Sequence, residues 1–79
     1  MGKRRVILSF NEEGAAEPII YNMGQEFNVM TNIRQANMAE NGGWIEVEIE
    51  GEEDNIVDGL DWVTSKGVRV DPAGGDSDS

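Results

Sequence analysis

The chain has 79 residues, enough for one small domain, and contains neither cysteine nor histidine, which excludes disulfides, thiol nucleophiles, imidazole bases and the common zinc and iron–sulfur sites. The net charge of −10 argues against nucleic acid or an anionic membrane as a partner, because binding phosphate requires a basic face. A core of this size contributes only a few kcal/mol of net stability, so self-association is the remaining means of support.

The first half of the chain predicts a strand, a helix and a second strand. Residues 4–10 (RRVILSF) alternate between apolar and other side chains, as a strand with one buried face does. Residues 11–17 (NEEGAAE) are expected to form a turn or loop. Pro18 suits a first helical turn, and the apolar stripe behind it predicts a helix that ends at Phe27. Residues 28–38 (NVMTNIRQANM) then predict a strand with an unusual number of asparagines.

The second half repeats this order. The Asn-Gly-Gly at 41–43 is a hairpin signal, and residues 44–51 (WIEVEIEG) alternate cleanly between aliphatic and acidic side chains. A second helix is expected over 52–67, with acids in its first turn and a glycine as its C-cap. Residues 68–72 (VRVDP) predict a short final strand.

This βαββαβ order predicts the α+β, ferredoxin-like sandwich, in which two helices cover one face of an antiparallel sheet. Right-handed crossovers give the strand order 4-1-3-2, so the second and fourth strands are edges. The domain is expected to span residues 1–72, and residues 73–79 are expected to form a disordered acidic tail. One face of the sheet is left without helices.

The glutamates of the third strand should lie on this open face. Counting back from the hairpin places Arg34 opposite Glu48 and Asn32 opposite Glu50. Cross-strand ion pairs would then neutralise part of the glutamate row. A metal site is the alternative, but alternate strand residues stand about 7 Å apart and do not converge on a cation. We therefore expect no metal and no cofactor.

Two apolar residues, Ile7 and Trp44, should also lie on the open face, where they suggest a covered surface that includes Met30. Alternatively, Trp44 lies over the end of the hairpin within one chain. In either case the second strand is an edge, and edges often pair. We expect a homodimer, or a complex with a protein partner, through the second strand.

Several segments, in order, resemble the NIL domain family over about residues 4–72. They are VILSF, then EPII at the start of the first helix, FNVMTNIRQANM, GGWIEVEIEG, DGLDWV and GVRV. The family takes its name from an Asn-Ile-Leu stretch, which here is Asn32-Ile33-Arg34, so the third position departs. Such domains regulate methionine-importer ATPases from their carboxy termini, where they bind methionine and pair with a second copy. Others are fused to ferredoxin modules in proteins of sulfur assimilation, and the GGW segment looks more like that group. A free-standing copy is expected here.

The resemblance implies a ligand site around Asn32, which matches the asparagine that holds methionine in the importer domain, together with its neighbours Ile33 and Arg34. An asparagine amide offers both a donor and an acceptor. Met30 and Met38 offer soft surface that suits a thioether. Arg34 could pair with Glu48 or reach the carboxylate of the ligand. The ligand would be methionine or a related sulfur metabolite.

The alternative function is a ligand-free interaction module that serves a sulfur-assimilation or redox protein through its edge strand and acidic surface. An enzyme is not expected, because no histidine is present to activate a serine or threonine. The sequence lacks a signal-peptide core and an apolar stretch of membrane-spanning length, so a cytoplasmic protein is expected.

Overall fold

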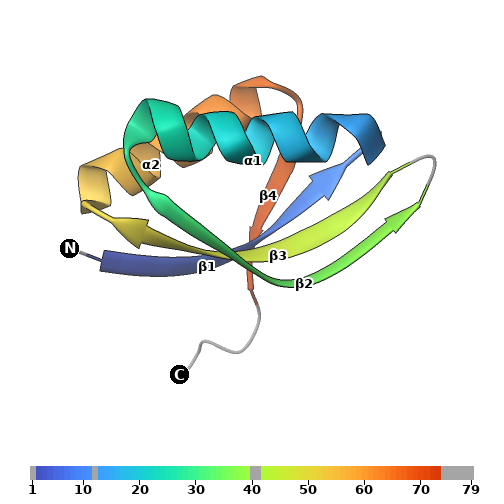
Figure 1. The fold of residues 1–79 in the computed structure, drawn as a ribbon, viewed down its shortest axis with the longest axis horizontal. Helices are drawn as coiled ribbons and strands as arrows, with labels where there is room; N and C mark the ends of the chain where they lie inside the picture. Colours follow the sequence, from blue (N-terminus) through green and yellow to red (C-terminus); the bar gives the residue numbers. More distant parts are fainter. Residues whose placement is uncertain (1, 12, 40–41, 74–79) are drawn as a thin grey trace.

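The computed structural model describes residues 2–11, 13–39 and 42–73, and it has the expected α+β, ferredoxin-like order of elements (Figure 1). The sheet order is β2-β3-β1-β4, which confirms the predicted 4-1-3-2 arrangement. All strand pairs are antiparallel, and β2 and β4 are the edges. The elements are β1 (Gly2–Phe10), α1 (Glu13–Phe27), β2 (Met30–Ala39), β3 (Gly42–Gly51), α2 (Glu53–Ser65) and β4 (Arg69–Pro72).

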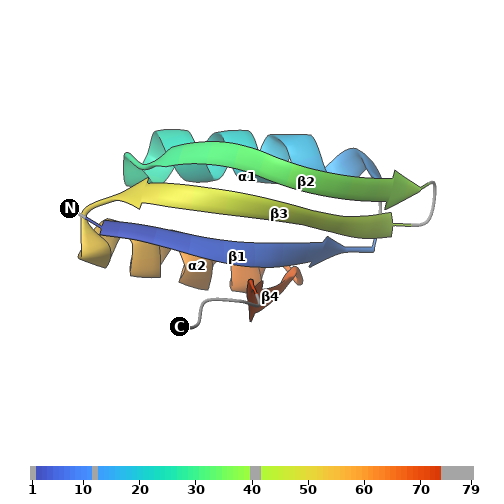
Figure 2. The same ribbon diagram turned by 90° about the horizontal axis from the view of Figure 1, so that it is seen from below.

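Both helices lie on one side of the sheet, with α1 toward the β2 edge and α2 toward the β4 edge, so that the other side is open (Figure 2). The core lies between these layers, and no polar or charged residue is buried among the residues described. The helices approach closely at Gly59, where a Cβ atom would lie 3.2 Å from the Met23 Cγ. Fully buried side chains of the core are Leu8, Met23, Val47, Ile49, Ile56 and Val63.

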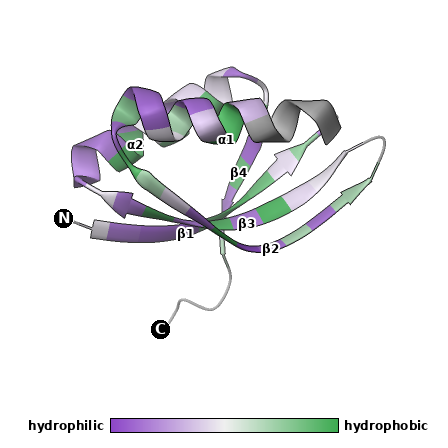
Figure 3. Ribbon diagram, viewed as in Figure 1, coloured by the Kyte–Doolittle hydropathy of each residue, from purple (hydrophilic) through white to green (hydrophobic). Residues whose placement is uncertain are grey.

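The alternation of the central strands creates two different faces from the same segments, as the colour bands along β1 and β3 show (Figure 3). On β3, Ile45, Val47 and Ile49 are buried beneath the helices, while the glutamates between them point to the open side. On β1, buried and less buried residues alternate from Val6 to Phe10. The predicted half-buried strands are therefore present.

The start of α1 differs from the prediction. The helix begins at Glu13, so the loop expected over 11–17 is largely helical and Pro18 lies inside the helix. Proline at this position lacks the N–H that would donate to the Gly14 carbonyl, and its ring crowds that carbonyl, so the helix tolerates it at a cost near its first turns. The segment before it contains alanines and acidic residues, which favour the first turns of a helix. The proline was therefore a poor marker of the helix start.

Each helix ends at a residue with left-handed backbone. Asn28 follows α1 with φ 55°, and the N–H of Val29 donates to the Gly24 carbonyl at 3.2 Å, as in a Schellman motif. Gly67 follows α2 with φ 88°, and its N–H donates to the Thr64 carbonyl at 3.0 Å. The predicted role of Gly67 at the end of the second helix is thus confirmed.

The packed domain extends one residue past β4. Ala73, assigned to the tail from the sequence, is buried, and its N–H donates to the Arg5 carbonyl at 3.1 Å. The rest of the expected tail, residues 74–79, lies outside the described residues. Neither helix combines the length and apolar character needed to cross a membrane.

Candidate functional site

The edge strand β2 positions the candidate residues, and its register differs from the one predicted. Asn32 lies opposite Glu48 rather than Glu50, and Met30 lies opposite Glu50. The register shifts between Ile33 and Gln35, which leaves Arg34 as the extra residue of a bulge. Counting back from the turn failed for two reasons: the strands already pair at Ala39–Gly42, and the bulge adds one more residue to β2.

The contact expected between Arg34 and Glu48 is present, but it is made from the bulge. The Arg34 Nη1 and Glu48 Oε1 atoms are 3.5 Å apart, and a second pair joins Arg5 Nε to Glu46 Oε2 at 3.7 Å. Both distances exceed the 2.7–2.9 Å or so of a strong charge-assisted hydrogen bond. The glutamate row is therefore neutralised loosely by arginines on both sides. Within the described residues, no group of three or more possible ligands could hold a metal ion.

The structure divides the four candidate ligand-binding residues between the two faces. Asn32 is exposed on the open face beside the Arg34–Glu48 pair. Ile33 points to the helix side, where it remains 57% exposed because β2 is the edge of the sheet. Met38 also belongs to the helix side and packs partly buried against the core. Only Asn32 and Arg34 are thus brought together at one place.

The three candidate interface residues all lie on the open face. Ile7 pairs with Glu46, and Trp44 lies between Ser9 and Asn37 in the register; both apolar side chains are half-buried within the single chain. Met30 is 62% exposed. The expected apolar surface on this face is therefore broken into separate residues by polar neighbours.

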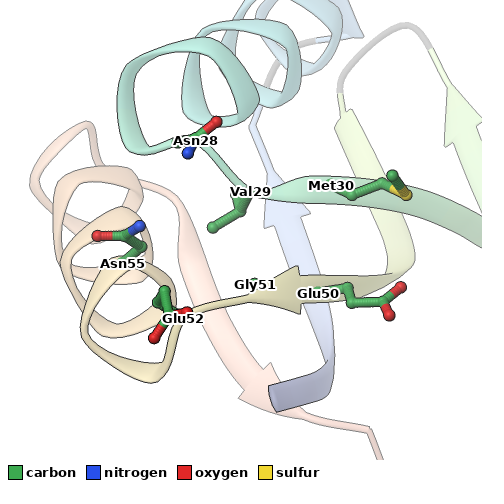
Figure 4. A pocket seen from close by; sticks show the side chains of 7 residues that line it. All are labelled: Asn28, Val29, Met30, Glu50, Gly51, Glu52 and Asn55. Atoms are coloured by element: carbon green, nitrogen blue, oxygen red, sulfur yellow. The ribbon is translucent and has the colours of Figure 1, made fainter. Parts of the chain in front are cut away.

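A groove that the sequence did not reveal lies where α1 ends, β2 begins, β3 ends and α2 begins (Figure 4). Its volume is about 490 Å³. Asn28 and Asn55 lie on the helix side of the groove, and Met30 and Glu50 point together to the other side. The lining residues are Asn28, Val29, Met30, Glu50, Gly51, Glu52 and Asn55. Two segments far apart in the sequence, 28–30 and 50–55, form it, so no local motif predicts it.

The groove combines two asparagine amides, two carboxylates and an apolar wall of Val29 and Met30. Amides donate and accept, whereas carboxylates only accept, so this lining suits a small polar molecule with an apolar part. Hydroxyls on α2 are engaged elsewhere: Thr64 donates to the Leu60 carbonyl at 2.9 Å and Ser65 to the Trp62 carbonyl at 2.6 Å. The groove can therefore bind such a molecule, and none of the residues that line it carries a hydroxyl or thiol group.

The fold and the order of segments have clear relatives. A structure of the C-terminal domain of an ABC transporter/ATP-binding protein from Enterococcus faecalis is similar, with a TM-score of 0.79 and 28% identity; the match covers 92% of this chain and 86% of that one. The de novo designed protein Foldit4 shares the fold, with a TM-score of 0.59 and 11% identity over 87% of this chain and 89% of its own. No curated protein gives a significant sequence match. The family model of the NIL domain matches residues 4–72, and the chain therefore belongs to the NIL domain family.

Proposed function

We propose that this domain is a cytoplasmic regulatory module that binds methionine or a related sulfur metabolite on the open side of β2. The observation that carries the proposal is the position of Asn32, exposed on an edge strand beside the loosely held Arg34–Glu48 pair. The similar Enterococcus faecalis domain belongs to an ATP-binding transporter protein. That relationship supports a module that serves a larger protein.

The spacing along β2 suits a ligand of amino-acid size. Met30 and Asn32 point to the same side, about 7 Å apart, since alternate strand residues share a face. The Asn32 amide can contact an ammonium or a carboxylate group, and the flexible thioether of Met30 can adapt to an apolar tail. Met30 also lines the groove, so a ligand at Asn32 has space beyond the strand.

Isothermal titration calorimetry with methionine, homocysteine and S-adenosylmethionine tests this proposal. Asn32→Ala should weaken binding by about tenfold or more, since removing a polar contact to a charged group costs roughly 1.5–3 kcal/mol. Asn37→Ala is the matched control. Asn37 is exposed on the same strand and face, but it pairs with Trp44 and lies farther along β2, away from the proposed ligand. Absence of both heat and a thermal shift at millimolar ligand would refute the proposal.

Arg34→Leu gives this chain the Asn-Ile-Leu stretch from which the family takes its name. The variant distinguishes two possible roles of the arginine in ligand binding. If the guanidinium contacts the ligand carboxylate, the variant binds methionine more weakly than the wild type. If Arg34 merely displaces an apolar contact, the variant binds more tightly. The Arg34 Nη1 and Glu48 Oε1 atoms are 3.5 Å apart, which is too long for a strong hydrogen bond. Arg34 is therefore free to take either role.

The second candidate function is a ligand-free interaction module for a sulfur-assimilation or redox protein. The observation in its favour is that β2 is an edge strand whose side chains are exposed along most of its length. Such an edge can add a strand from another chain, either a homodimer partner or a different protein. Tight metabolite binding by the domain alone, with no stable protein partner in a pull-down, would exclude this function.

A further inference from the structure

The basic residues of the chain leave the carboxylates at the end of β3 without a partner. All 6 of them lie within the part of the chain that the structure describes, and none forms an ion pair with Glu50 or Glu52. Lys3 lies opposite Glu50 in the register, but the two side chains form no ion pair. The arginines are engaged elsewhere, in the pairs Arg4–Glu53, Arg5–Glu46, Arg34–Glu48 and Arg69–Asp71. Negative charge therefore remains where β3 passes into α2.

Both carboxylates line the groove of about 490 Å³ at the ends of the helices, together with the amides of Asn28 and Asn55. Among the described residues, none of these four side chains takes part in a hydrogen bond. Glu52 precedes α2 in the position of an N-cap, but its carboxylate makes no capping hydrogen bond. Glu50 and Asn55 are half-buried, so part of their hydration is already lost. The groove thus contains four polar side chains whose partners are not supplied by the described residues.

The two carboxylates lie at different ends of the groove. Glu50 points with Met30 to the open side, whereas Glu52 lies at the start of α2 (Figure 4). Between them the groove is lined by the apolar side chain of Val29 and by the backbone of Gly51. An acidic group at each end and an apolar middle suit a ligand with two positive groups joined by a hydrocarbon chain.

The positive end of the α2 dipole opposes a cation in the groove, but it is the weaker influence. It amounts to roughly half a charge, whereas Glu50 and Glu52 each contribute a full negative charge, and no basic residue lines the groove. A metal ion is a poorer occupant, because no three possible ligands converge anywhere in the described residues. An ammonium group needs fewer acceptors than a metal ion and donates hydrogen bonds to carboxylate and amide oxygens alike.

We infer that the groove binds an aliphatic diamine. One ammonium group lies at Glu50, the other lies at Glu52 and the two asparagine amides, and the hydrocarbon chain packs against Val29. This site goes beyond the proposed function, because Asn32 does not line the groove and a diamine contains no sulfur. The two sites share Met30 but no charged group.

Isothermal titration calorimetry tests this inference with three probes. Diaminopentane is compared with pentylamine, which has the same chain and a single ammonium group, and with magnesium chloride, which supplies a divalent cation without a chain. The diamine should bind at least about tenfold more tightly than either, because it alone can contact both carboxylates and the apolar wall. A monoamine or magnesium ion that binds as tightly would overturn the inference, since the acidic surface as a whole would then be attracting cations. Absence of heat with the diamine at about 10 mM would also overturn it.

Variants of the groove locate the binding site. Glu50→Gln and Glu52→Gln keep the shape of each side chain and should each weaken diamine binding by about tenfold. Asp54→Asn is the matched control and should stay within about twofold of the wild type, because Asp54 is exposed in the first turn of α2 and does not line the groove. Lys3→Gln should strengthen binding about twofold or more, since it removes the base opposite Glu50.

Thermal unfolding without ligand checks that each variant is folded. A Glu50→Gln or Glu52→Gln variant that is folded and binds the diamine as the wild type does would overturn the inference. An Asp54→Asn variant that binds as weakly as Glu52→Gln would overturn it as well, because the loss would then follow the net charge of the helix start and not the groove.

Discussion

The two faces of the sheet come from alternating residues of the same strands, yet their chemistry is opposite. On the helix side of β3, Val47 and Ile49 are completely buried. On the open side of the same strand, Glu46 and Glu48 retain 16% and 20% exposure of their side chains and are held loosely by arginines. Burial of apolar area is worth far more than a partly solvated ion pair. The helix side therefore stabilises the fold, and the open side can vary to suit a function.

The largest effect should come from comparing Leu8 with its neighbour Ile7, which points to the other face. Leu8 is fully buried, so Leu8→Ala should lower the free energy of unfolding by about 2–5 kcal/mol through lost burial and the cavity left behind. Ile7 is half-buried on the open face, and Ile7→Ala should cost less than about 1 kcal/mol. Urea denaturation at low protein concentration measures both.

A small domain has little stability to lose, so Leu8→Ala could be largely unfolded without denaturant. Ile49→Val provides a milder probe of the same face, with an expected loss of about 0.5–1.5 kcal/mol. Equal losses for the Leu8 and Ile7 variants would mean that the open face is buried in solution by something other than this chain alone, and the assignment of stability to one face would fail.

The connections from helix to sheet should give an intermediate effect. Gly67 has φ 88°, and a Cβ atom there would meet nothing within 4 Å, so the cost of Gly67→Ala is purely conformational, about 1 kcal/mol. Asn28→Gly should have the opposite sign and stabilise by a few tenths of a kcal/mol, because glycine adopts φ 55° without strain. Thermal unfolding of both variants checks the signs. If Asn28→Gly lowers the stability as Gly67→Ala does, the Asn28 side chain must itself stabilise the end of α1.

Much of this fold follows from the sequence, because the helix-covered face leaves a strong alternating signal. Strands β1 and β3 alternate cleanly, and Gly67 marks the end of α2, so order and topology were predicted correctly. The start of α1 was not, because Pro18 gave a false boundary. Periodic burial of every second or fourth residue therefore locates strands and helices well. A single proline locates a helix start less well, because it can stand in the first turn or, as Pro18 does, inside the helix.

The candidate site was harder to predict because it lies on an edge. Arg34 occupies a bulge that no residue pattern indicates, and this bulge alters the register of Asn32. Nothing in the local pattern distinguishes Met38, which packs against the core, from Met30, which is exposed. The groove between Asn28 and Asn55 depends on how two distant segments meet. These features arise from tertiary structure, which periodicity cannot describe.

The smallest effect should come from the ion pair between Arg34 and Glu48, which tests the open face directly. A double-mutant cycle with Arg34→Ala and Glu48→Gln should give a coupling energy of about 0.2–1 kcal/mol, because the Arg34 side chain is 49% exposed and the charged atoms are 3.5 Å apart. Raising the salt to about 1 M should remove most of it, since the Debye length falls to about 3 Å. Dilute samples keep the measurement within one chain. A coupling energy that persists in high salt would mean that the pair is shielded from solvent. Glu48 would then contribute to the stability of the fold, although it lies on the open face.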